Sequence, residues 1–417
     1  MYYSVNDVLD FVRDNDVKFV KLGFCDLFGV QKNISIMVDE LEHAFEHGIA
    51  FNPTGVQGFG YYVETDLLLK PVASTMLVLP WRPQQGRVVQ LYCEIMHLDG
   101  TPYELDGRRL LKDALKACNE KQLKAKMGVK CEFYLFKTDE NGDSTGEPID
   151  QGEFLDISPK DRGENVRRDI CLTLEQMGIG IERSFHERGP GQNEIDLRDL
   201  DAMATADNYI TFKNVVRSIA ARSGVHASFL PKPLPGKSGN GLHINFSLYA
   251  KGENLFASDK EMMDHFLAGI VNRMQEMTLV LNTQPVSYDR FGESEAPKYI
   301  TWSTENRHQL LKVPHADEKG GRVVLRSPDA FINPYIGFAA LLRAGLAGID
   351  NKEELPAAVD QTINLMDPDS RKALETLPES LQEAISYARA GKFLKESFGE
   401  DFVEHFITAI ESGVYQA

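Results

Sequence analysis

The chain has 417 residues, of which 42% are hydrophobic and 26% charged, and its formal net charge is −17. This composition is typical of a globular protein with roughly two to three domains, and it excludes a disordered or fibrous chain. The acidity argues against nucleic acid or an anionic membrane as the main partner, although a local basic pocket for phosphate remains compatible with it.

The first hundred residues predict a small β-rich unit. Two strands flank Leu27-Phe28-Gly29, a pattern that indicates a β-hairpin. The turn Asp99-Gly100-Thr101-Pro102 predicts a boundary between a domain of residues 1–101 and a domain of residues 102–417. The predicted helices of this unit cover 4–14 and 38–47, and its predicted strands cover 17–26, 30–38, 75–80 and 87–98.

The rest of the chain alternates long helices with separated strands. The predicted helices lie near 106–122, 163–177, 201–222, 259–281, 333–348, 379–390 and 399–412. The predicted strands lie near 128–137, 180–186, 225–230, 241–249, 308–313 and 321–327. Long helices with separated strands, after a β-rich start, predict an α+β protein.

The strand predicted over 128–137 carries polar residues on one face. Residues two apart on a strand point the same way, so Lys130, Glu132 and Tyr134 share a face, opposite Cys131 and its neighbours. A glutamate in such a place, taken alone, is more often a solvated edge residue than a ligand.

Two further glutamates, Glu187 and Glu194, flank a loop rich in glycine and proline. We expect both carboxylates to lie on this tight loop, where they could bind Mg²⁺ or Mn²⁺, since these hard cations prefer oxygen ligands. Most glutamate pairs on loops are simply solvated, and that alternative stays open from the residues alone.

A glycine-rich turn precedes the strand predicted over 241–249. Gly239 and its glycine neighbours allow a backbone to approach a ligand closely, and His243, Asn245 and Ser247 then share one strand face. A single histidine is more often a satisfied core residue, so this pattern suggests a site without defining it.

Arginines gather in the last third of the chain. Arg322 and Arg326 share a face of the strand predicted over 321–327, and Arg290 and Arg307 precede it. Guanidinium groups suit a dispersed anion such as a phosphoryl group in transfer. The alternative is that they only neutralise some of the many acidic residues.

Several long segments together resemble the glutamine synthetase family, in order along nearly the whole chain. These segments are GQNEIDL, TADNYITFKNVVRSIA, ASFLPKPLPGKSGNGLHINFSL, SEAPKYITWSTENRHQLLKVP and RSPDAFINPYIGFAALLRAGLAGI. The resemblance implies a small N-terminal β-grasp domain and a larger catalytic domain whose antiparallel sheet is flanked by helices. It also implies ATP-dependent phosphorylation of a glutamate γ-carboxylate, followed by attack of an amine, in sites that form between subunits of a hexameric or dodecameric ring.

The resemblance also implies roles for individual residues. It places Glu132, Glu187 and Glu194 at the first metal, His243 at the second metal and beside the substrate, and Gly239, Arg290 and Arg326 at the acid substrate. It assigns ATP to Ser247, Arg307, Lys312 and Arg322, and catalysis to Arg307, Arg326 and the flap residue Glu295.

Some positions depart from the family pattern. Asn52 replaces the aspartate that takes the proton of ammonium, and an amide cannot accept that proton. Lys130 and Val324 stand where two glutamates of the second metal site are usual, so that His243 alone remains. Ser238 replaces an asparagine beside the substrate, and Tyr61 a regulatory arginine of some members. We expect one metal site fewer, with the Lys130 ammonium in a catalytic role in place of the second ion.

Three functions stay open on this evidence. The first is a ligase that uses ATP, Mg²⁺ or Mn²⁺, a glutamate-like acid and an amine other than ammonium. The second is a non-catalytic or regulatory homologue, and the third is an ammonia-using glutamine synthetase. The five scattered cysteines, the acidic N-terminus and the lack of a long apolar run predict a cytoplasmic protein with reduced thiols and no membrane segment.

Overall fold

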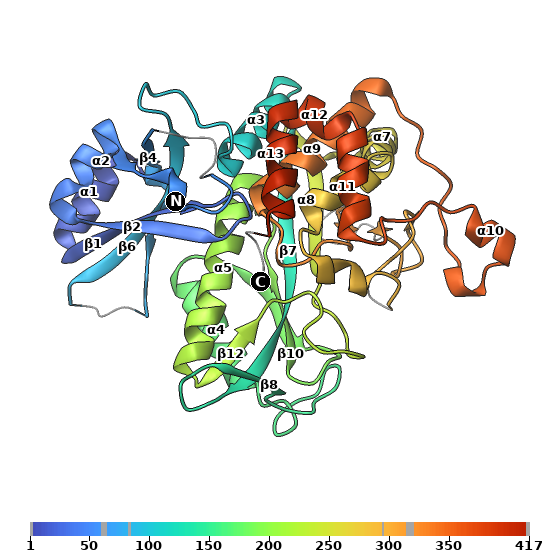
Figure 1. The fold of residues 1–417 in the computed structure, drawn as a ribbon, viewed down its shortest axis with the longest axis horizontal. Helices are drawn as coiled ribbons and strands as arrows, with labels where there is room; N and C mark the ends of the chain where they lie inside the picture. The colour runs from blue at the N-terminus through green and yellow to red at the C-terminus, as the bar shows by residue number, and fades with distance from the viewer. Residues whose placement is uncertain (1–2, 60–64, 82–84, 294–295, 314–320, 414–417) are drawn as a thin grey trace.

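The computed structural model describes residues 3–59, 65–81, 85–293, 296–313 and 321–413 (Figure 1). The N-terminal part folds around a six-stranded sheet with the order β2-β1-β6-β4-β3, in which β5 also pairs with β6. Its elements are α1 (Val5–Asp14), β1 (Val17–Cys25), β2 (Gln31–Met37), α2 (Leu41–His47), β3 (Ile49–Phe51), β4 (Leu67–Pro71), β5 (Leu77–Val78) and β6 (Arg87–Met96).

The predicted hairpin is confirmed. β1 and β2 are antiparallel, and Cys25 faces Gln31 across the turn. Asp26 holds this turn, since its carboxylate accepts from the backbone N–H groups of Phe28 (3.0 Å) and Val30 (2.9 Å). The strand predicted over 75–80 is wrong in extent, because a 3₁₀ turn over Ala73–Thr75 leaves only Leu77–Val78 extended.

The larger part of the chain is built on a second sheet. Its strands are β7 (Lys124–Thr138), β8 (Ser144–Pro148), β9 (Ile181–His186), β10 (Gln192–Leu197), β11 (Leu200–Asp201), β12 (Val225–Ser228), β13 (Leu242–Ala250), β14 (Glu253–Asn254), β15 (Trp302–Ser303), β16 (Leu311–Lys312) and β17 (Val323–Leu325). Its helices are α3 (Gly107–Glu120), α4 (Glu164–Gln176), α5 (Ala202–Arg222), α6 (Leu255–Ser258), α7 (Lys260–Val271), α8 (Met274–Leu281), α9 (Pro334–Asn351), α10 (Pro368–Lys372), α11 (Leu381–Ala390), α12 (Phe393–Phe398) and α13 (Glu400–Glu411).

This sheet has 11 strands, and its main path runs β15-β16-β17-β13-β7-β10-β9. All of its pairings are antiparallel except that of β15 with β16. With helices packed against it, the sheet confirms the predicted α+β class and the predicted antiparallel sheet flanked by helices. Among the described residues, no helix combines the length and apolarity that crossing a bilayer requires.

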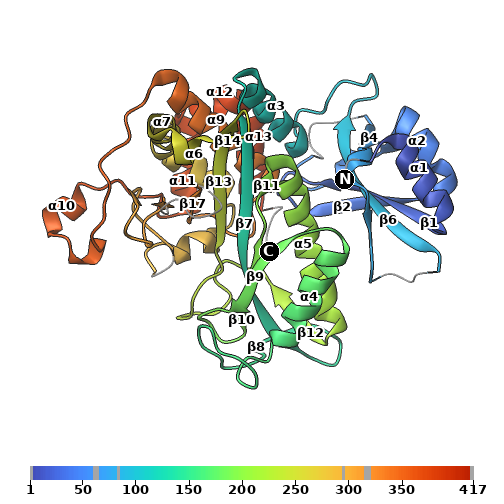
Figure 2. The same cartoon turned by 180° about the vertical axis from the view of Figure 1, so that it is seen from behind.

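The long strand β7 separates a core face from a polar face. Cys131, Phe133 and Leu135 are fully buried on the side covered by α5, where Phe133 meets Phe212 edge to face at 6.4 Å. Figure 1 shows α5 in front of the sheet, and Figure 2 shows β7 and β13 in front when the molecule is turned around. The polar residues of β7 therefore lie on the side away from α5, as its alternation predicts.

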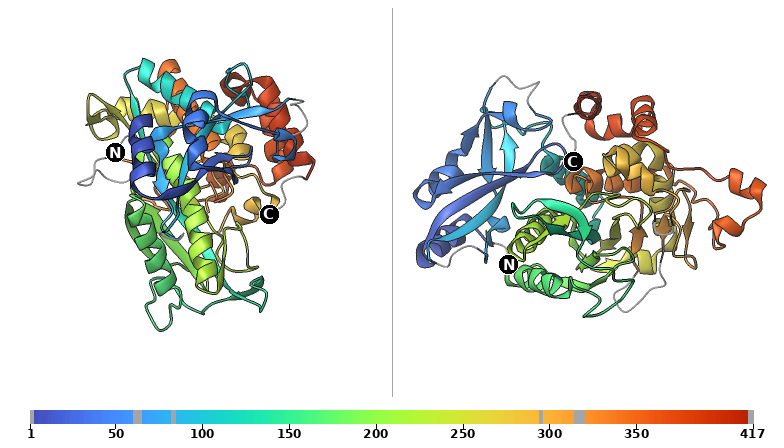
Figure 3. Two further views of the ribbon diagram at one scale, coloured as in Figure 1. Left: turned by 90° about the vertical axis from the view of Figure 1, so that its left-hand side faces the viewer. Right: turned by 60° about the horizontal axis from the view of Figure 1, so that its bottom comes forward.

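The helix predicted over 259–281 is two helices, α7 and α8. The chain breaks at Asn272 and Arg273, whose side chains both donate to the Glu353 carboxylate, over 2.7 Å from Asn272 Nδ2 and 2.7 Å from Arg273 Nη2. The segment around α10, for which no element was predicted, projects away from the rest of the chain, as the right-hand view of Figure 3 shows.

Candidate active site

The polar face of the sheet brings three glutamates together. Glu132 on β7 lies directly opposite Glu194 on β10, and Glu187 follows the end of β9. One carboxylate oxygen from each of the three residues lies within 4.8 Å of the others, and all three side chains are buried. The expectation that Glu187 and Glu194 share a loop is wrong for Glu194. Glu194 lies on strand β10, and the antiparallel pairing of β10 with β7 places it directly opposite Glu132.

The electrostatics of this acidic cluster favour a bound cation. Burial and the neighbouring carboxylates of Asp196, Glu132 and Glu187 raise the pKa of Glu194 well above its ordinary value. Glu194 forms no ion pair with any described residue. Glu132 accepts from the backbone N–H of Gly241 (2.8 Å) and from Gln192 Nε2 (3.3 Å). Three buried carboxylates are the ligand set that Mg²⁺ or Mn²⁺ prefers, so the residues present fit a divalent cation.

A second row of charged residues crosses the sheet beside this cluster. Lys130 on β7 lies opposite both Asp196 on β10 and His243 on β13. Its Nζ is 3.6 Å from Asp196 Oδ2, an oxygen that also accepts from Arg183 Nε at 2.6 Å. Asp196 is fully buried. The carboxylate of Asp196 therefore lies between two cations, Arg183 and Lys130. Lys130 is the residue that we expected to replace the second metal ion.

Both Lys130 and His243 are shifted toward their uncharged forms. Burial lowers the pKa of Lys130, and nearby Arg183 and Arg322 act in the same direction, against the attraction of Asp196 and Glu194. Burial lowers the pKa of His243 well below its ordinary value, and the positive charges of Arg326 and Lys130 add to this effect. A neutral imidazole can accept a hydrogen bond or bind a metal, because one ring nitrogen keeps a free lone pair.

Arg290 lies at one end of this face, fully enclosed. Its Nη1 donates to the backbone oxygen of Ser327 (3.2 Å) and lies 3.8 Å from Asp329 Oδ2. Gly239 must be a glycine here, because a Cβ on it would lie 2.6 Å from the Pro231 oxygen and 2.7 Å from Arg290 Cγ. A small cavity between them is lined by Glu132, Ser238, Gly239, Gly241, His243, Arg290, Glu293 and Ala296.

A larger cavity of about 390 Å³ lies at the other end, around Ser247 and Arg322. Arg322 Nη1 is 3.2 Å from Asp199 Oδ2 and 3.5 Å from Glu182 Oε1. Burial lowers the pKa of Arg322, but these two carboxylates outweigh it and raise the pKa. The cavity is also lined by Lys126, Arg198, Tyr249 and Gly321.

The remaining predicted cations gather between these two ends. Burial lowers the pKa of Lys312, and the neighbouring charges of Arg307, Lys130, Arg326 and Arg183 lower it further. Val324 of β17 pairs with both Lys312 and Asn245, so an apolar side chain lies in the row where an acid was expected from the resemblance. The described site residues that the sequence predicts thus lie on or near this face of the sheet, and two further residues need separate mention.

These two residues are Glu295 and Asn52. Glu295, like Tyr61, lies outside the described residues. Asn52 is exposed in the N-terminal part, where its Oδ1 accepts from the backbone N–H (2.9 Å) and the hydroxyl (2.7 Å) of Thr54. Within one chain, no hydrogen bond or ion pair of a described residue joins Asn52 to the polar face of the catalytic sheet.

The sequence did not indicate several residues that order this site, namely Arg183, Asp196, Gln192, Asp199, Glu182 and Asp329. Asp196 had a usable signal, because it lies two residues after Glu194 and shares its strand face. Asp329 had none, because only the fold brings it to Arg290.

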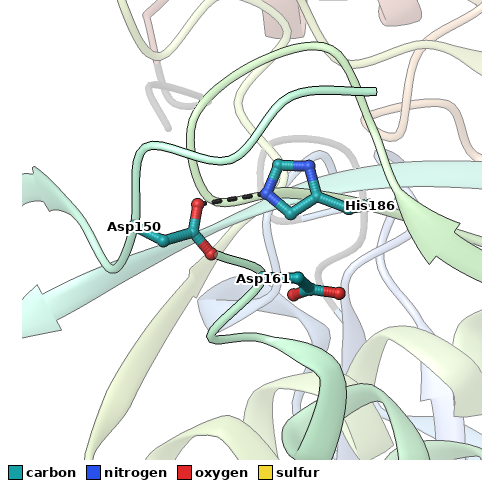
Figure 4. A group of neighbouring side chains, drawn as sticks. All are labelled: Asp150, Asp161 and His186. Atoms are coloured by element: carbon teal, nitrogen blue, oxygen red, sulfur yellow. Dashed lines mark hydrogen bonds and ion pairs between the residues drawn. The ribbon is translucent and has the colours of Figure 1, made fainter. Parts of the chain in front are cut away.

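A second buried cluster joins Asp150, Asp161 and His186, as Figure 4 shows. Here the charges are already matched. Asp161 Oδ2 pairs with Arg167 Nη2 at 2.6 Å. His186 faces Asp150 Oδ1 through Nε2 (3.0 Å) and the backbone oxygen of Glu187 through Nδ1 (2.6 Å). Both ring nitrogens face oxygen atoms that can accept a hydrogen bond, an arrangement that favours the protonated ring. Burial lowers the pKa of His186, but these hydrogen bonds outweigh it and raise the pKa.

Comparison with known proteins gives matches along almost the whole chain. A sequence family described as the glutamine synthetase β-grasp domain matches residues 16–98, and one described as the glutamine synthetase catalytic domain matches residues 104–416. The glutamine synthetase of Clostridium saccharobutylicum is 42% identical over 97% of this chain and 94% of its own length. That of Methanosarcina mazei is also 42% identical, over 97% of this chain and 93% of its own length.

Solved structures give the same result for the fold. A structure described as a GmaS/ADP complex superimposes with a TM-score of 0.88 at 28% identity, covering 97% of this chain and 95% of its own. The glutamine synthetase of Plasmodium falciparum superimposes with a TM-score of 0.87, covering 99% of this chain and 96% of its own. At 20% identity, this second likeness concerns the fold alone.

Proposed function

The chain belongs to the glutamine synthetase family, and we propose that it is an ATP-dependent ligase that phosphorylates the γ-carboxylate of glutamate, or of a glutamate-like acid, and condenses it with an amine other than ammonium. The observation that carries this proposal is the buried cluster of Glu132, Glu187 and Glu194 beside several cationic side chains on one sheet face. A carboxylate is a poor electrophile, and phosphoryl transfer to it requires this combination of metal-binding acids and positive charge.

In the proposed reaction, Glu132, Glu187 and Glu194 would hold Mg²⁺ or Mn²⁺. The bound cation would neutralise negative charge on the phosphate groups of ATP during transfer. Gly239, His243 and Arg290 would bind the acid substrate, and Ser247 and Arg322 would bind ATP in the cavity of about 390 Å³. Arg307, Lys312 and Arg326 would hold the transferring phosphoryl group between these two ends, and the flap residue Glu295 would close the site.

We further propose that the enzyme works with one metal fewer than the family norm. Lys130 is opposite His243 and within 3.6 Å of Asp196, so its ammonium is available where the resemblance expects the second ion. Replacing one glutamate by Lys130 adds about two positive charges, and replacing another by Val324 adds about one, whereas losing a divalent cation removes about two. The net charge of the site therefore changes by only about one, and a buried site requires its charges to be nearly balanced. A structure with nucleotide and Mn²⁺ that held two ions beside His243 would refute this part of the proposal.

The amine follows from Asn52. If the sites form between subunits, as the resemblance implies, the N-terminal domain of a neighbour would bring this residue to the site. An amide cannot take a proton from ammonium, and the Asn52 oxygen is already engaged by Thr54. A larger amine, bound in part by apolar contact, depends less on an anion at this position.

The test is ADP release with Mg²⁺ or Mn²⁺, glutamate and a panel of amines that includes ammonium, with mass spectrometry of the products. The proposal expects ADP release that depends on one of the larger amines, together with a γ-glutamyl amide of the matching mass. ADP release with ammonium alone would refute the inference from Asn52. This result would favour the alternative of an ordinary glutamine synthetase, which is the activity named for the two relatives at 42% identity.

The third alternative is a homologue without catalysis. A protein of this kind could still bind ATP, so nucleotide binding does not distinguish it from an enzyme. ADP release does, and its absence across a panel of amines and of glutamate analogues would favour this alternative. We also propose that the protein is cytoplasmic and forms a homo-oligomeric ring of 6 or 12 subunits, with domains of residues 1–101 and 102–417. Electron microscopy of the purified protein would test the ring and the division into domains.

A further inference from the structure

The cavity proposed for the acid substrate contains a carboxylate to which the proposed reaction gives no role. Glu293 lines this cavity together with Arg290, the arginine that would bind the acid. The two residues are close along the chain, and the backbone N–H of Glu293 donates to the backbone oxygen of Arg290 at 3.2 Å. A negative charge in this place opposes the binding of an acid that carries two carboxylates of its own.

Glu293 differs in this respect from Glu132, the other acid that lines the cavity. Glu132 belongs to the cluster that would hold a divalent cation, and Glu293 lies outside that cluster. The charge of Glu293 also reaches the substrate-binding arginine. Burial lowers the pKa of Arg290, and the charges of Asp329, Glu132 and Glu293 oppose this effect. Glu293 is therefore the acid of the cavity wall that a bound metal would not neutralise.

A lysine from another part of the chain pairs with this carboxylate. Lys232 Nζ forms an ion pair with Glu293 Oε1 and also donates to the backbone oxygen of Lys237 at 2.6 Å. Only 11% of the Lys232 side chain is exposed, against 44% of the Glu293 side chain. A largely buried lysine whose ammonium meets two acceptors has a defined position, which most surface ion pairs lack.

Lys232 lies in the loop that forms the other wall of the cavity. This loop closes at its base, where the backbone N–H of Asn240 donates to the backbone oxygen of Pro231 at 2.8 Å. Gly239 of the same loop lines the cavity. The ion pair between Lys232 and Glu293 thus joins the two walls of the cavity, and it places a positive charge on the one acid that would repel the substrate.

We propose, on the basis of the acid substrate in the proposed function, that Lys232 is a positioning residue that neutralises Glu293 and holds its carboxylate away from a dicarboxylic amino acid bound beside Arg290. Lys232 acts through Glu293 and touches no atom of the substrate. Without the ammonium, the Glu293 carboxylate would repel the carboxylates of the substrate across a poorly solvated cavity. The need for Lys232 should therefore disappear when Glu293 loses its charge.

The test is isothermal titration calorimetry of L-glutamate with the full-length protein in its native oligomer, with Mg²⁺ present. Lys232→Met is expected to weaken glutamate binding about tenfold, because the variant keeps the Glu293 charge and removes its counter-charge. Glu293→Gln is expected to bind glutamate at least as tightly as wild type. The double variant Lys232→Met/Glu293→Gln is expected to return to within about threefold of wild type, a rescue that damage to the fold could not produce.

Lys298→Met is the matched control. Lys298 lies two residues after Ala296 of the cavity wall, and it pairs with Glu379 at 2.6 Å outside the cavity. This variant is expected to leave glutamate binding unchanged. In steady-state kinetics, Lys232→Met should raise the KM for glutamate and leave the KM for ATP unchanged, whereas general damage to the fold would affect both substrates.

A double variant that binds glutamate as weakly as Lys232→Met would overturn the proposal, since the lysine would then act through the fold alone. So would a Glu293→Gln variant that binds glutamate more weakly and glutarate equally well, because Glu293 would then bind the amino group that glutarate lacks. Wild-type protein that does not bind glutamate would also overturn it.

The outcome for Lys232 is separable from the outcome for the ligase. If wild type releases no ADP with any amine but the variants keep the expected order of glutamate affinities, the proposed reaction is refuted and the role of Lys232 is supported. Normal ADP release together with equal glutamate affinities in all variants would refute the role of Lys232 and leave the proposed reaction intact.

Discussion

The described residues form two buried clusters of three candidate metal ligands, and the clusters differ in how their charges are compensated. In both, the ligand atoms lie within 4.8 Å of one another. In the cluster of Glu132, Glu187 and Glu194, burial and neighbouring carboxylates raise the pKa of Glu194 well above its ordinary value. In the cluster of Asp150, Asp161 and His186, burial raises the pKa of Asp150, but hydrogen bonds from His186 and three backbone N–H groups outweigh it and lower the pKa to about 2.

The difference shows that proximity alone does not make a metal site. In the second cluster, the guanidinium of Arg167 pairs with Asp161 and the ring of His186 faces Asp150, so a further positive ion has little to neutralise. The first cluster gathers negative charge without an ion pair to Glu194 among the described residues. We therefore expect a divalent cation to bind the first cluster, and we expect the second to act as a structural anchor for the chain on both sides of Glu187.

The largest expected effect comes from removing a ligand of the first cluster. We expect Glu194→Gln to lower ADP release about 100-fold or more, because the bound ion supplies several kcal/mol to phosphoryl transfer. Wild-type protein should also gain unfolding free energy with Mn²⁺, about 2.7 kcal/mol at 100 times the Kd, and the variant should lose most of this gain. In EDTA the variant should be at least as stable as wild type, since the amide removes one of three adjacent negative charges.

Asp161→Asn is the matched control in the second cluster. It should destabilise the protein and keep the stabilisation by Mn²⁺, measured by differential scanning calorimetry with and without the ion. A loss of the Mn²⁺ effect in Asp161→Asn, combined with its retention in Glu194→Gln, would reverse the comparison between the two clusters.

The next effect is on stability. Asp150→Asn should lower the unfolding free energy by about 2 kcal/mol at pH 7, since a buried carboxylate loses charge-assisted hydrogen bonds to His186 and to the backbone of Gly152, Arg162 and Gly191. Because the folded pKa of about 2 is below the ordinary 3.8, this contribution is present above pH 4 and is lost as the pH falls toward 2. Urea unfolding of both proteins at several pH values measures it. A difference that grew as the pH fell would contradict this explanation.

Asp196 refines the comparison, because this carboxylate neighbours Glu194 and yet has cations of its own. Lys130→Met should lower ADP release about tenfold, since it removes the ammonium proposed to replace a metal and leaves Arg183 to neutralise Asp196. Arg183→Met, on the more exposed side of the same carboxylate, is the control and should have a smaller effect. If the two variants were equally active, Lys130 would have no special role in the reaction.

Whether a strand and its faces could be predicted from the sequence depends on whether one or both of its faces are buried. β7 alternates between polar and apolar residues, and its two faces followed from that period alone, as did the side on which Lys130 and Glu132 lie. β10 was missed, because all six of its residues are buried and four of them are polar, so no alternation is visible. Its identity comes from pairing with β7, a long-range contact that local patterns do not encode.

The same limit applies to the charges. The resemblance placed Glu132, Glu187 and Glu194 together, but the anchoring pair Asp150 and His186 is 36 residues apart and lies outside any motif. The break between α7 and α8 depends on Glu353, about 80 residues further along the chain. Interactions of this kind depend on the complete fold, whereas periodicity and turns depend on neighbours in sequence.

The smallest expected effect concerns Arg322, where two acids already hold one cation. Asp199 and Glu182 both face its guanidinium, at 3.2 and 3.5 Å, beside the cavity proposed for ATP. Asp199→Asn should raise the KM for ATP about threefold and leave kcat nearly unchanged, because Glu182 still orients the arginine and a partly exposed ion pair contributes less than about 1 kcal/mol. Glu182→Gln is the matched variant. The loss of ATP binding free energy in the double variant should exceed the sum of the losses in the two single variants, since the double variant leaves the guanidinium without an orienting acid. Steady-state kinetics with ATP as the varied substrate measures all three. A large fall in kcat for Asp199→Asn would mean that Asp199 takes part in the reaction itself, and the two acids would then resemble the first cluster more than the second.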